Sequence, residues 1–147
     1  MNGNVQKYET YKARMENLKR AMKCGYFLES ILIEYAVIED RVNSLLSHAG
    51  KGTSQKLHKK CEKIVKAREC DDRFGKALQK YISDDLIRDL DAWRVARNEI
   101  VHDLMKKPYN AEEFREVAED GLAVVKLLSN RVKCCNRVSD KLAQKKA

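Results

Sequence analysis

One stretch of the sequence, residues 26–48, carries an apolar stripe that constrains the fold more than any other feature. Its large apolar side chains recur at alternating steps of three and four residues: Leu28, Ile31, Tyr35, Ile38, Val42 and Leu45. This spacing places them on one face of an α-helix, whereas a strand would need a period of two. Other helices or a partner chain must cover such a face. The stripe therefore predicts a helical bundle.

Composition indicates an all-α fold throughout. The 147 residues include one proline and six glycines, 35% of them are charged and 44% are hydrophobic. This chain length suits one domain with a single core. We expect a compact up-and-down bundle of about five helices over residues 1–135, followed by a disordered basic tail over residues 136–147.

Breaks and capping residues predict where the helices begin and end. We expect helices over residues 5–24, 26–48, 55–69 and 72–81, then from Ser83 to about 105 or 107, and from about 110 past 130. Gly25 separates the first two helices, and Ser83 is a predicted N-cap. Pro108 ends the fifth helix, and Glu113 stands at the capping-box position of the last one.

Cysteine usage and hydropathy indicate a cytoplasmic protein. The five cysteines include no CxxC pair, and the N-terminus has no apolar signal segment, so we expect reduced thiols and no metal site or other cofactor. Cys134 and Cys135 are adjacent, and the sequence does not reveal whether they sense redox state. The apolar runs are too short to cross a bilayer, so no membrane partner is expected.

Positive charge is concentrated in two segments. Residues 51–70 carry seven Lys and Arg against two Asp and Glu, and residues 126–147 carry seven against one, whereas residues 71–125 carry nine against thirteen. These basic segments are expected to attract a polyanion, although solvated helix faces are an equally simple interpretation. The candidate RNA contacts are Lys56, Lys59, Lys60 and Lys63.

The segment RNEIVH, residues 97–102, combines residue types suited to phosphodiester cleavage. Arginine is always charged and binds phosphate oxygens in a fork, and histidine gives and takes protons near neutral pH. Asn98 lies four residues before His102, so its amide can orient the imidazole or bind a substrate oxygen.

Arg97 falls within the apolar stripe predicted for residues 83–105, which comprises Leu86, Leu90, Trp93, Ile100, Val101 and Leu104. A guanidinium there must face a cleft or an interface, or pair with an acid such as Glu34 or Glu39. His102 is about 140° around an ideal helix from Arg97. The two side chains would therefore converge only through a helix distortion or through a second copy of the chain.

The residues Arg97, Asn98 and His102 resemble the RNxxxH motif of HEPN domains (higher eukaryotes and prokaryotes nucleotide-binding), which are all-α bundles. The resemblance covers most of residues 5–135: the motif lies on a penultimate long helix, an earlier helix carries the acidic residues Glu34 and Glu39, and a final helix follows.

The resemblance implies a metal-independent endoribonuclease that acts as a homodimer and leaves 2′,3′-cyclic phosphate ends. Arg97 and His102 would be catalytic, Asn98 would orient them, and Glu34 and Glu39 would support the site. Tyr109, near the motif, is a candidate for stacking on an RNA base. The alternatives are a non-catalytic HEPN module that binds RNA, a nucleotide or a protein partner, and a helical interaction protein in which Arg97 is buried and paired.

One departure from the family pattern bears on partners. HEPN toxins that pair with a minimal nucleotidyltransferase antitoxin often carry tyrosine two residues after the histidine, where this chain has Leu104. The sequence therefore does not support that partner. A different antitoxin or regulatory protein, a defence role and a housekeeping role in RNA metabolism are all compatible with the motif.

Overall fold

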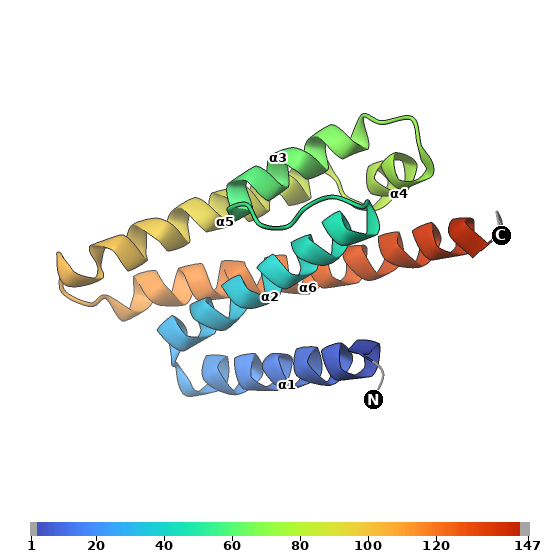
Figure 1. The fold of residues 1–147 in the computed structure, drawn as a ribbon. Coiled ribbons are helices and arrows are strands. Elements are labelled where there is room, and N and C mark those ends of the chain that lie inside the picture. Colours follow the sequence, from blue (N-terminus) through green and yellow to red (C-terminus); the bar gives the residue numbers. More distant parts are fainter. Residues whose placement is uncertain (1–2, 145–147) are drawn as a thin grey trace. The chain divides into compact units, whose positions relative to one another are not determined.

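The computed structural model describes residues 3–144, with side chains as far as residue 141. In this range the chain forms six α-helices and one short 3₁₀ turn, and no strand (Figure 1). In chain order they are α1 (Gly3–Cys24), α2 (Phe27–His48), α3 (Leu57–Arg68), α4 (Arg73–Tyr81), α5 (Asp84–His102), η1 (Asp103–Met105) and α6 (Ala111–Gln144). The predicted all-α fold class is confirmed, with six helices where about five were expected.

Local signals in the sequence determine where several helices begin. Ser83 Oγ accepts the backbone N–H of Leu86 at 3.1 Å, and Asn110 Oδ1 accepts that of Glu112 at 3.1 Å. Both are N-cap hydrogen bonds, which satisfy donors that have no partner inside the helix. Gly25 has φ 76° and joins α1 to α2, because a residue without Cβ adopts this conformation at little cost.

The fifth helix ends earlier than the sequence predicts. α5 stops at His102, and the 3₁₀ turn η1 then carries the chain to Met105, three residues before Pro108. Of the predicted apolar stripe, Trp93 and Ile100 are buried, as are the earlier leucines. Leu104 is 40% exposed, since it lies beyond the end of α5.

The last helix is longer than expected. α6 continues to Gln144, so residues 136–144, which we expected in a disordered tail, are helical. Ser139 is buried within this segment and, after Cys135, continues the buried face of the helix. The remaining residues of the expected tail, 145–147, lie outside the described range.

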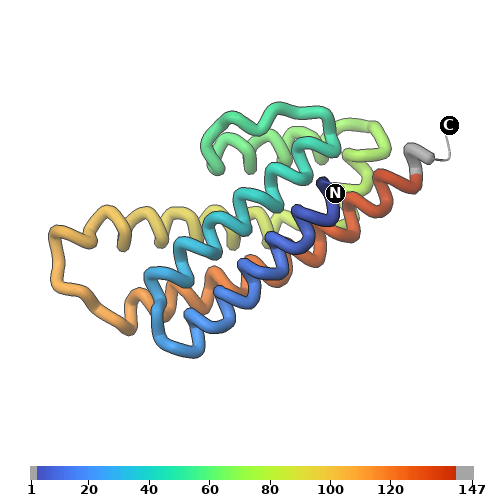
Figure 2. The backbone as a smooth tube through the Cα atoms, turned by 60° about the horizontal axis from the view of Figure 1, so that its bottom comes forward, coloured from blue at the N-terminus to red at the C-terminus, as the bar shows by residue number. Residues whose placement is uncertain are grey.

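Within the region expected as one domain, the chain forms two compact units, each assembled from two segments. Unit 1 combines Met1–Val37 with Trp93–Ala123. In this unit α1 reverses into the start of α2, as the blue part of the tube shows (Figure 2). Its buried side chains include Leu18, Ala21, Ile31, Glu34, Val37, Trp93, Ile100, Phe114, Val117 and Ala118.

Unit 2 combines Ile38–Ala92 with Val124–Ala147. Within it α3 and α4 contact each other closely at Gly75, where a Cβ atom would lie 2.9 Å from the backbone oxygen of Ala67 and closer still to that of Cys70. The core of this unit includes Ile38, Val42, Leu45, Leu57, Ile64, Leu78, Ile82, Leu86, Leu90, Leu128 and Val132. This core contains Leu86 and Leu90 of the stripe predicted for residues 83–105 and the second half of the stripe predicted for residues 26–48.

Candidate functional site

Arg97 is held in place by an aromatic ring and an amide. Its guanidinium carbon lies 4.3 Å from the centroid of the Tyr35 ring, a cation–π distance. Nη1 donates a hydrogen bond to Asn98 Oδ1 at 2.9 Å. Tyr35 in turn lies 6.4 Å from Trp93, centroid to centroid. These contacts restrict the orientation of the guanidinium, which reduces the entropy lost when it binds an anion.

His102 lies in the last turn of α5 and its side chain is exposed. Lys106 Nζ lies 2.8 Å from His102 Nε2. An ammonium group has only donors, so Nε2 is the acceptor and carries no proton. In this contact the tautomer is the one with hydrogen on Nδ1, which leaves a lone pair on Nε2, as a general base requires.

Arg97 and His102 do not converge within one chain. α5 is α-helical from Asp84 to His102, without a break between the two residues. At five residues apart on a regular helix, their side chains leave the axis about 140° from one another. The helix distortion that would bring them together is therefore not present in α5.

The alternative that Arg97 pairs with a buried acid does not describe this site. Within the described residues Arg97 makes no ion pair, and its Nε is buried without a hydrogen-bond partner. Glu39 instead lies 3.7 Å from Lys60 Nζ, in unit 2. Glu34, in unit 1, is fully buried, and neither carboxyl oxygen has a hydrogen-bond partner.

Glu34 lies at a close approach between α2, α5 and α6. Trp93 Nε1 donates to the backbone oxygen of Val117 at 3.0 Å, which brings the indole against α6. A Cβ atom on Gly121 would lie 2.6 Å from Trp93 Nε1 and closer still to Glu34 Oε1. The missing side chain at position 121 therefore makes room for both the carboxyl and the indole.

Burial sets the protonation state of Glu34. Desolvation, together with the nearby charge of Asp120, raises the pKa of the Glu34 carboxyl from 4.5 to about 9. The group is neutral at physiological pH, so it cannot serve as a counterion to Arg97 there. Glu34 directly precedes Tyr35, the residue whose ring stacks on Arg97, and its supporting role stays a prediction.

Replacing Gly121 with alanine is expected to destabilise the protein by about 1–2 kcal/mol. Overpacking against Glu34 and Trp93 should outweigh the gain in helix propensity. Urea unfolding measures the change. Gly3→Ala is the control, since no atom lies within 4 Å of a Cβ built there. Unchanged stability of the Gly121→Ala protein would show that the close approach is not tight in solution.

The lysines proposed as RNA contacts differ in their availability. Lys60 is buried and paired with Glu39, so its ammonium is not offered to a ligand. Lys59 lies 3.3 Å from Glu62, and Lys63 donates to the backbone oxygen of Gly52 at 3.1 Å. Lys56 is exposed. Most cationic side chains of α3 are thus paired with other groups of the protein.

Tyr109 has a structural role that the sequence did not suggest. Its ring packs on Phe114 with centroids 4.8 Å apart. With Asn110 as the N-cap, these residues occupy the positions of a hydrophobic staple, which fixes the direction in which the chain enters α6. The residue as a whole remains 59% exposed, and its role in stacking on a base stays a prediction.

The five cysteines are all free thiols. Cys134 and Cys135 do not form the vicinal disulfide that their adjacency would permit. Burial raises the pKa of the Cys135 thiol to about 11, so it is protonated and unreactive at neutral pH.

Three residues of the site were missed by reasoning from the sequence. Lys106 stands four residues after His102, a spacing that places the two on one helix face and could have been noticed. Tyr35 was assigned only to the apolar stripe. Gly121 is isolated in a helix, which is a weak sign of close packing.

The chain matches no family model, no curated protein and no solved structure. None of the helices in the described range is long and apolar enough to span a membrane. The described side chains form no cluster of three or more His, Cys, Asp or Glu that could hold a metal ion.

Proposed function

We propose that this protein is a metal-independent endoribonuclease of the HEPN type, which acts as a homodimer. The observation that carries the proposal is the pairing of two features near the end of α5. A guanidinium is oriented by Tyr35 and Asn98, and an exposed imidazole follows at His102. The first suits a phosphate, and the second suits proton transfer.

The reaction assigns a role to each group. His102 Nε2 removes the proton of a ribose 2′-hydroxyl, after Lys106 has moved aside, and the 2′-oxygen bonds to the adjacent phosphorus. The bond from phosphorus to the 5′-oxygen breaks, and that oxygen takes a proton from the His102 of a second copy in its imidazolium form. Arg97 stabilises the charge that develops on the phosphoryl oxygens. The products are a 2′,3′-cyclic phosphate and a 5′-hydroxyl.

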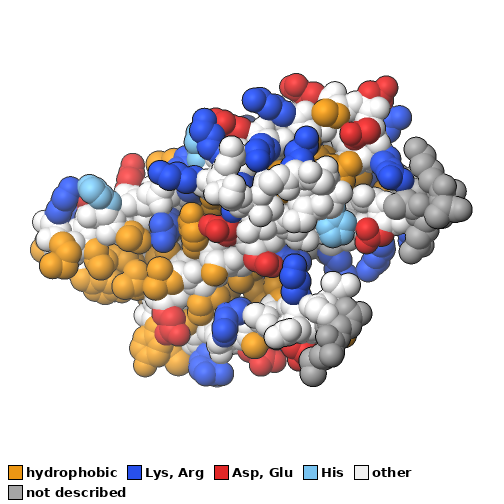
Figure 3. Space-filling model, in the orientation of Figure 1, with side chains coloured by type: hydrophobic (Ala, Val, Ile, Leu, Met, Phe, Trp, Pro, Cys, Tyr) orange, Lys and Arg blue, Asp and Glu red, His pale blue; other side chains and the backbone are white. Residues whose placement is uncertain are grey.

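A second copy is required because the reaction uses one His102 as the base and the His102 of another copy as the acid. Val95, Asn98 and His102 occupy one exposed face of α5, at intervals of three and four residues. Val95 is 41% exposed and Met105 is 93% exposed. Hydrophobic side chains also gather over the end of α5 and the start of α6 (Figure 3). A symmetric contact through this face would bring two His102 side chains together.

The product chemistry tests the proposal. A DNA strand with a single ribonucleotide should be cut only after that ribonucleotide, in the presence of EDTA, and mass spectrometry should find the cyclic phosphate. A strand with 2′-O-methyl at that position should remain intact, because the nucleophile is blocked. Cleavage of all-DNA strands would contradict the mechanism. RNA that is bound but never cut would favour the non-catalytic module instead.

A further inference from the structure

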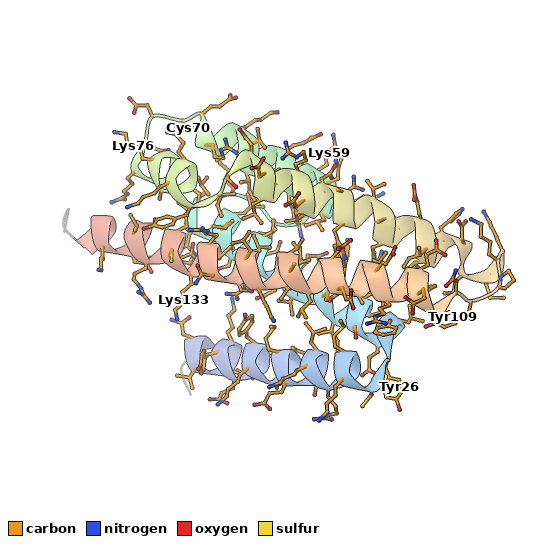
Figure 4. All side chains as sticks on the ribbon, turned by 180° about the vertical axis from the view of Figure 1, so that it is seen from behind. Tyr26, Lys59, Cys70, Lys76, Tyr109 and Lys133 are labelled. Atoms are coloured by element: carbon orange, nitrogen blue, oxygen red, sulfur yellow. The ribbon has the colours of Figure 1, made fainter. Side chains whose placement is uncertain are left out.

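The C-terminal part of α6 presents a stripe of exposed basic side chains. We define the α6 basic stripe as Lys126, Lys133, Arg137 and Lys141, which lie in unit 2. At about 100° per residue the four fall within about 80° of one another. They are opposite the buried face of the helix, which comprises Val124, Val125, Leu128, Val132, Cys135 and Ser139. Lys133, one member of the stripe, extends from α6 (Figure 4).

The cations of the α6 basic stripe differ in their pairing from most of those of α3. Within the described residues, none of its four side chains makes a salt bridge or a side-chain hydrogen bond. The acid nearest in sequence, Asp140, lies 3.6 Å from His48 Nε2. In contrast, Lys59, Lys60 and Lys63 of α3 all have partners in the protein. Most cations of α3 are therefore paired, whereas all four cations of the α6 basic stripe remain free within the described range.

Helix stability does not account for the stripe. Basic residues near a helix C-terminus interact favourably with the macrodipole, but this effect is confined to about the last turn. Lys126 and Lys133 lie 18 and 11 residues before the end of α6 at Gln144. The solvent face of α6 also changes sign, from Glu112, Glu113, Glu116 and Glu119 to the stripe. Some other interaction must therefore favour this row of four cations.

We propose that the α6 basic stripe binds the phosphate backbone of RNA. The choice of RNA rests on the proposed function, whereas the attraction for phosphates rests on the stripe alone. A helix that inserts into an anionic membrane surface needs an exposed apolar face beside its basic one. The apolar face of α6 is buried in unit 2, and Leu127 is the large hydrophobic exposed beside the stripe, at 43%. These features favour a nucleic-acid backbone over a lipid surface.

The stripe has the length and charge to follow several phosphates. From Lys126 to Lys141 it spans about 22 Å along the helix axis. Four phosphate contacts predict a slope of about −2.8 for the logarithm of affinity against the logarithm of salt concentration, on single-stranded RNA. Affinity should then fall about 50-fold between about 50 and about 200 mM salt.

A double substitution of the stripe tests this inference. Binding of a fluorescein-labelled oligouridylate is measured by anisotropy over a range of salt concentrations, in the His102→Ala protein so that no RNA is cut. Lys133→Gln with Arg137→Gln removes two contacts. The salt slope should decrease by about 1.4, and affinity at about 100 mM salt should fall about 25-fold.

A matched control separates the stripe from net charge. Lys76→Gln with Arg88→Gln also removes one lysine and one arginine from unit 2, but these cations pair with Asp71 and Asp85 (Figure 4 labels Lys76). This control should leave the salt slope nearly unchanged. Equal losses in the two double variants would overturn the inference, as would unchanged binding in the stripe variant.

Two further comparisons identify the partner and separate the proposals. Vesicles of phosphatidylcholine and phosphatidylserine should bind the protein weakly. If the stripe variant lost vesicle binding but kept RNA binding, the assignment of the stripe to RNA would be wrong. Stripe-dependent binding in a protein that never cleaves RNA would refute the proposed function alone. Cleavage by the wild type with stripe-independent binding would refute this inference alone.

Discussion

Replacement of His102 by alanine is expected to slow RNA cleavage by roughly 10²- to 10⁴-fold, the range typical of a lost general acid or base. The side chain is exposed, and its hydrogen-bond partner is Lys106, whose own side chain is exposed. Circular dichroism and thermal unfolding should therefore match the wild type. Cleavage is measured in metal-free buffer under single-turnover conditions.

Two controls make this result specific. His58→Ala removes another exposed imidazole, one that pairs with Glu62 on α3, and should leave cleavage unchanged. Arg97→Ala should also be inactive, and mixing it with His102→Ala should restore part of the activity if opposite copies combine their residues in one site. If His102→Ala protein cleaves RNA as fast as wild type, the catalytic assignment is incorrect.

Replacement of Glu34 by glutamine is expected to stabilise the protein by about 3 kcal/mol at pH 7 and to change how stability depends on pH. The folded-state pKa of Glu34 is raised from 4.5 to about 9, so between these values the folded chain holds a proton that the unfolded chain has lost. The contribution of Glu34 to the free energy of unfolding is therefore fully present below pH 4.5. It decreases by about 1.4 kcal/mol per pH unit up to about pH 9. Glutamine has nearly the same shape and does not titrate.

The measurement is the free energy of unfolding in urea at several pH values. The stability difference between Glu34→Gln and the wild type should be small near pH 5 and should grow steadily towards pH 9. Glu29→Gln, at an exposed position on the same helix, should not reproduce this trend. A difference that stays constant with pH would mean that Glu34 is not buried as a neutral acid.

The sequence predicted the helices well because their determinants are local. The stripe over residues 26–48, the N-cap Ser83 and the stop at Pro108 each act within a few residues of their own position. The candidate catalytic residues were also visible, because Arg97, Asn98 and His102 lie on one helix. The chemistry proposed for these three residues follows from their types and spacing, and the ribonuclease activity stays a prediction.

The surroundings of the motif could not be predicted, because they depend on residues far apart in the chain. Tyr35 stacks on Arg97 from another helix, and Gly121 accommodates Glu34 from a third. Counts of charged residues along the sequence could not predict which cations are paired, for the same reason. The count for residues 51–70 did not distinguish Lys60, which is buried with Glu39, from cations that remain in solvent.

The close approach of Glu34, Trp93 and Gly121 has an evolutionary consequence. These three side chains share one volume, so a larger residue at position 121 is tolerable only if position 34 or 93 becomes smaller. Homologues that carry alanine or serine at position 121 should therefore also carry a shorter side chain at position 34. Because Tyr35 follows Glu34 directly, such a paired change would shift the ring beneath Arg97 and with it the orientation of the guanidinium.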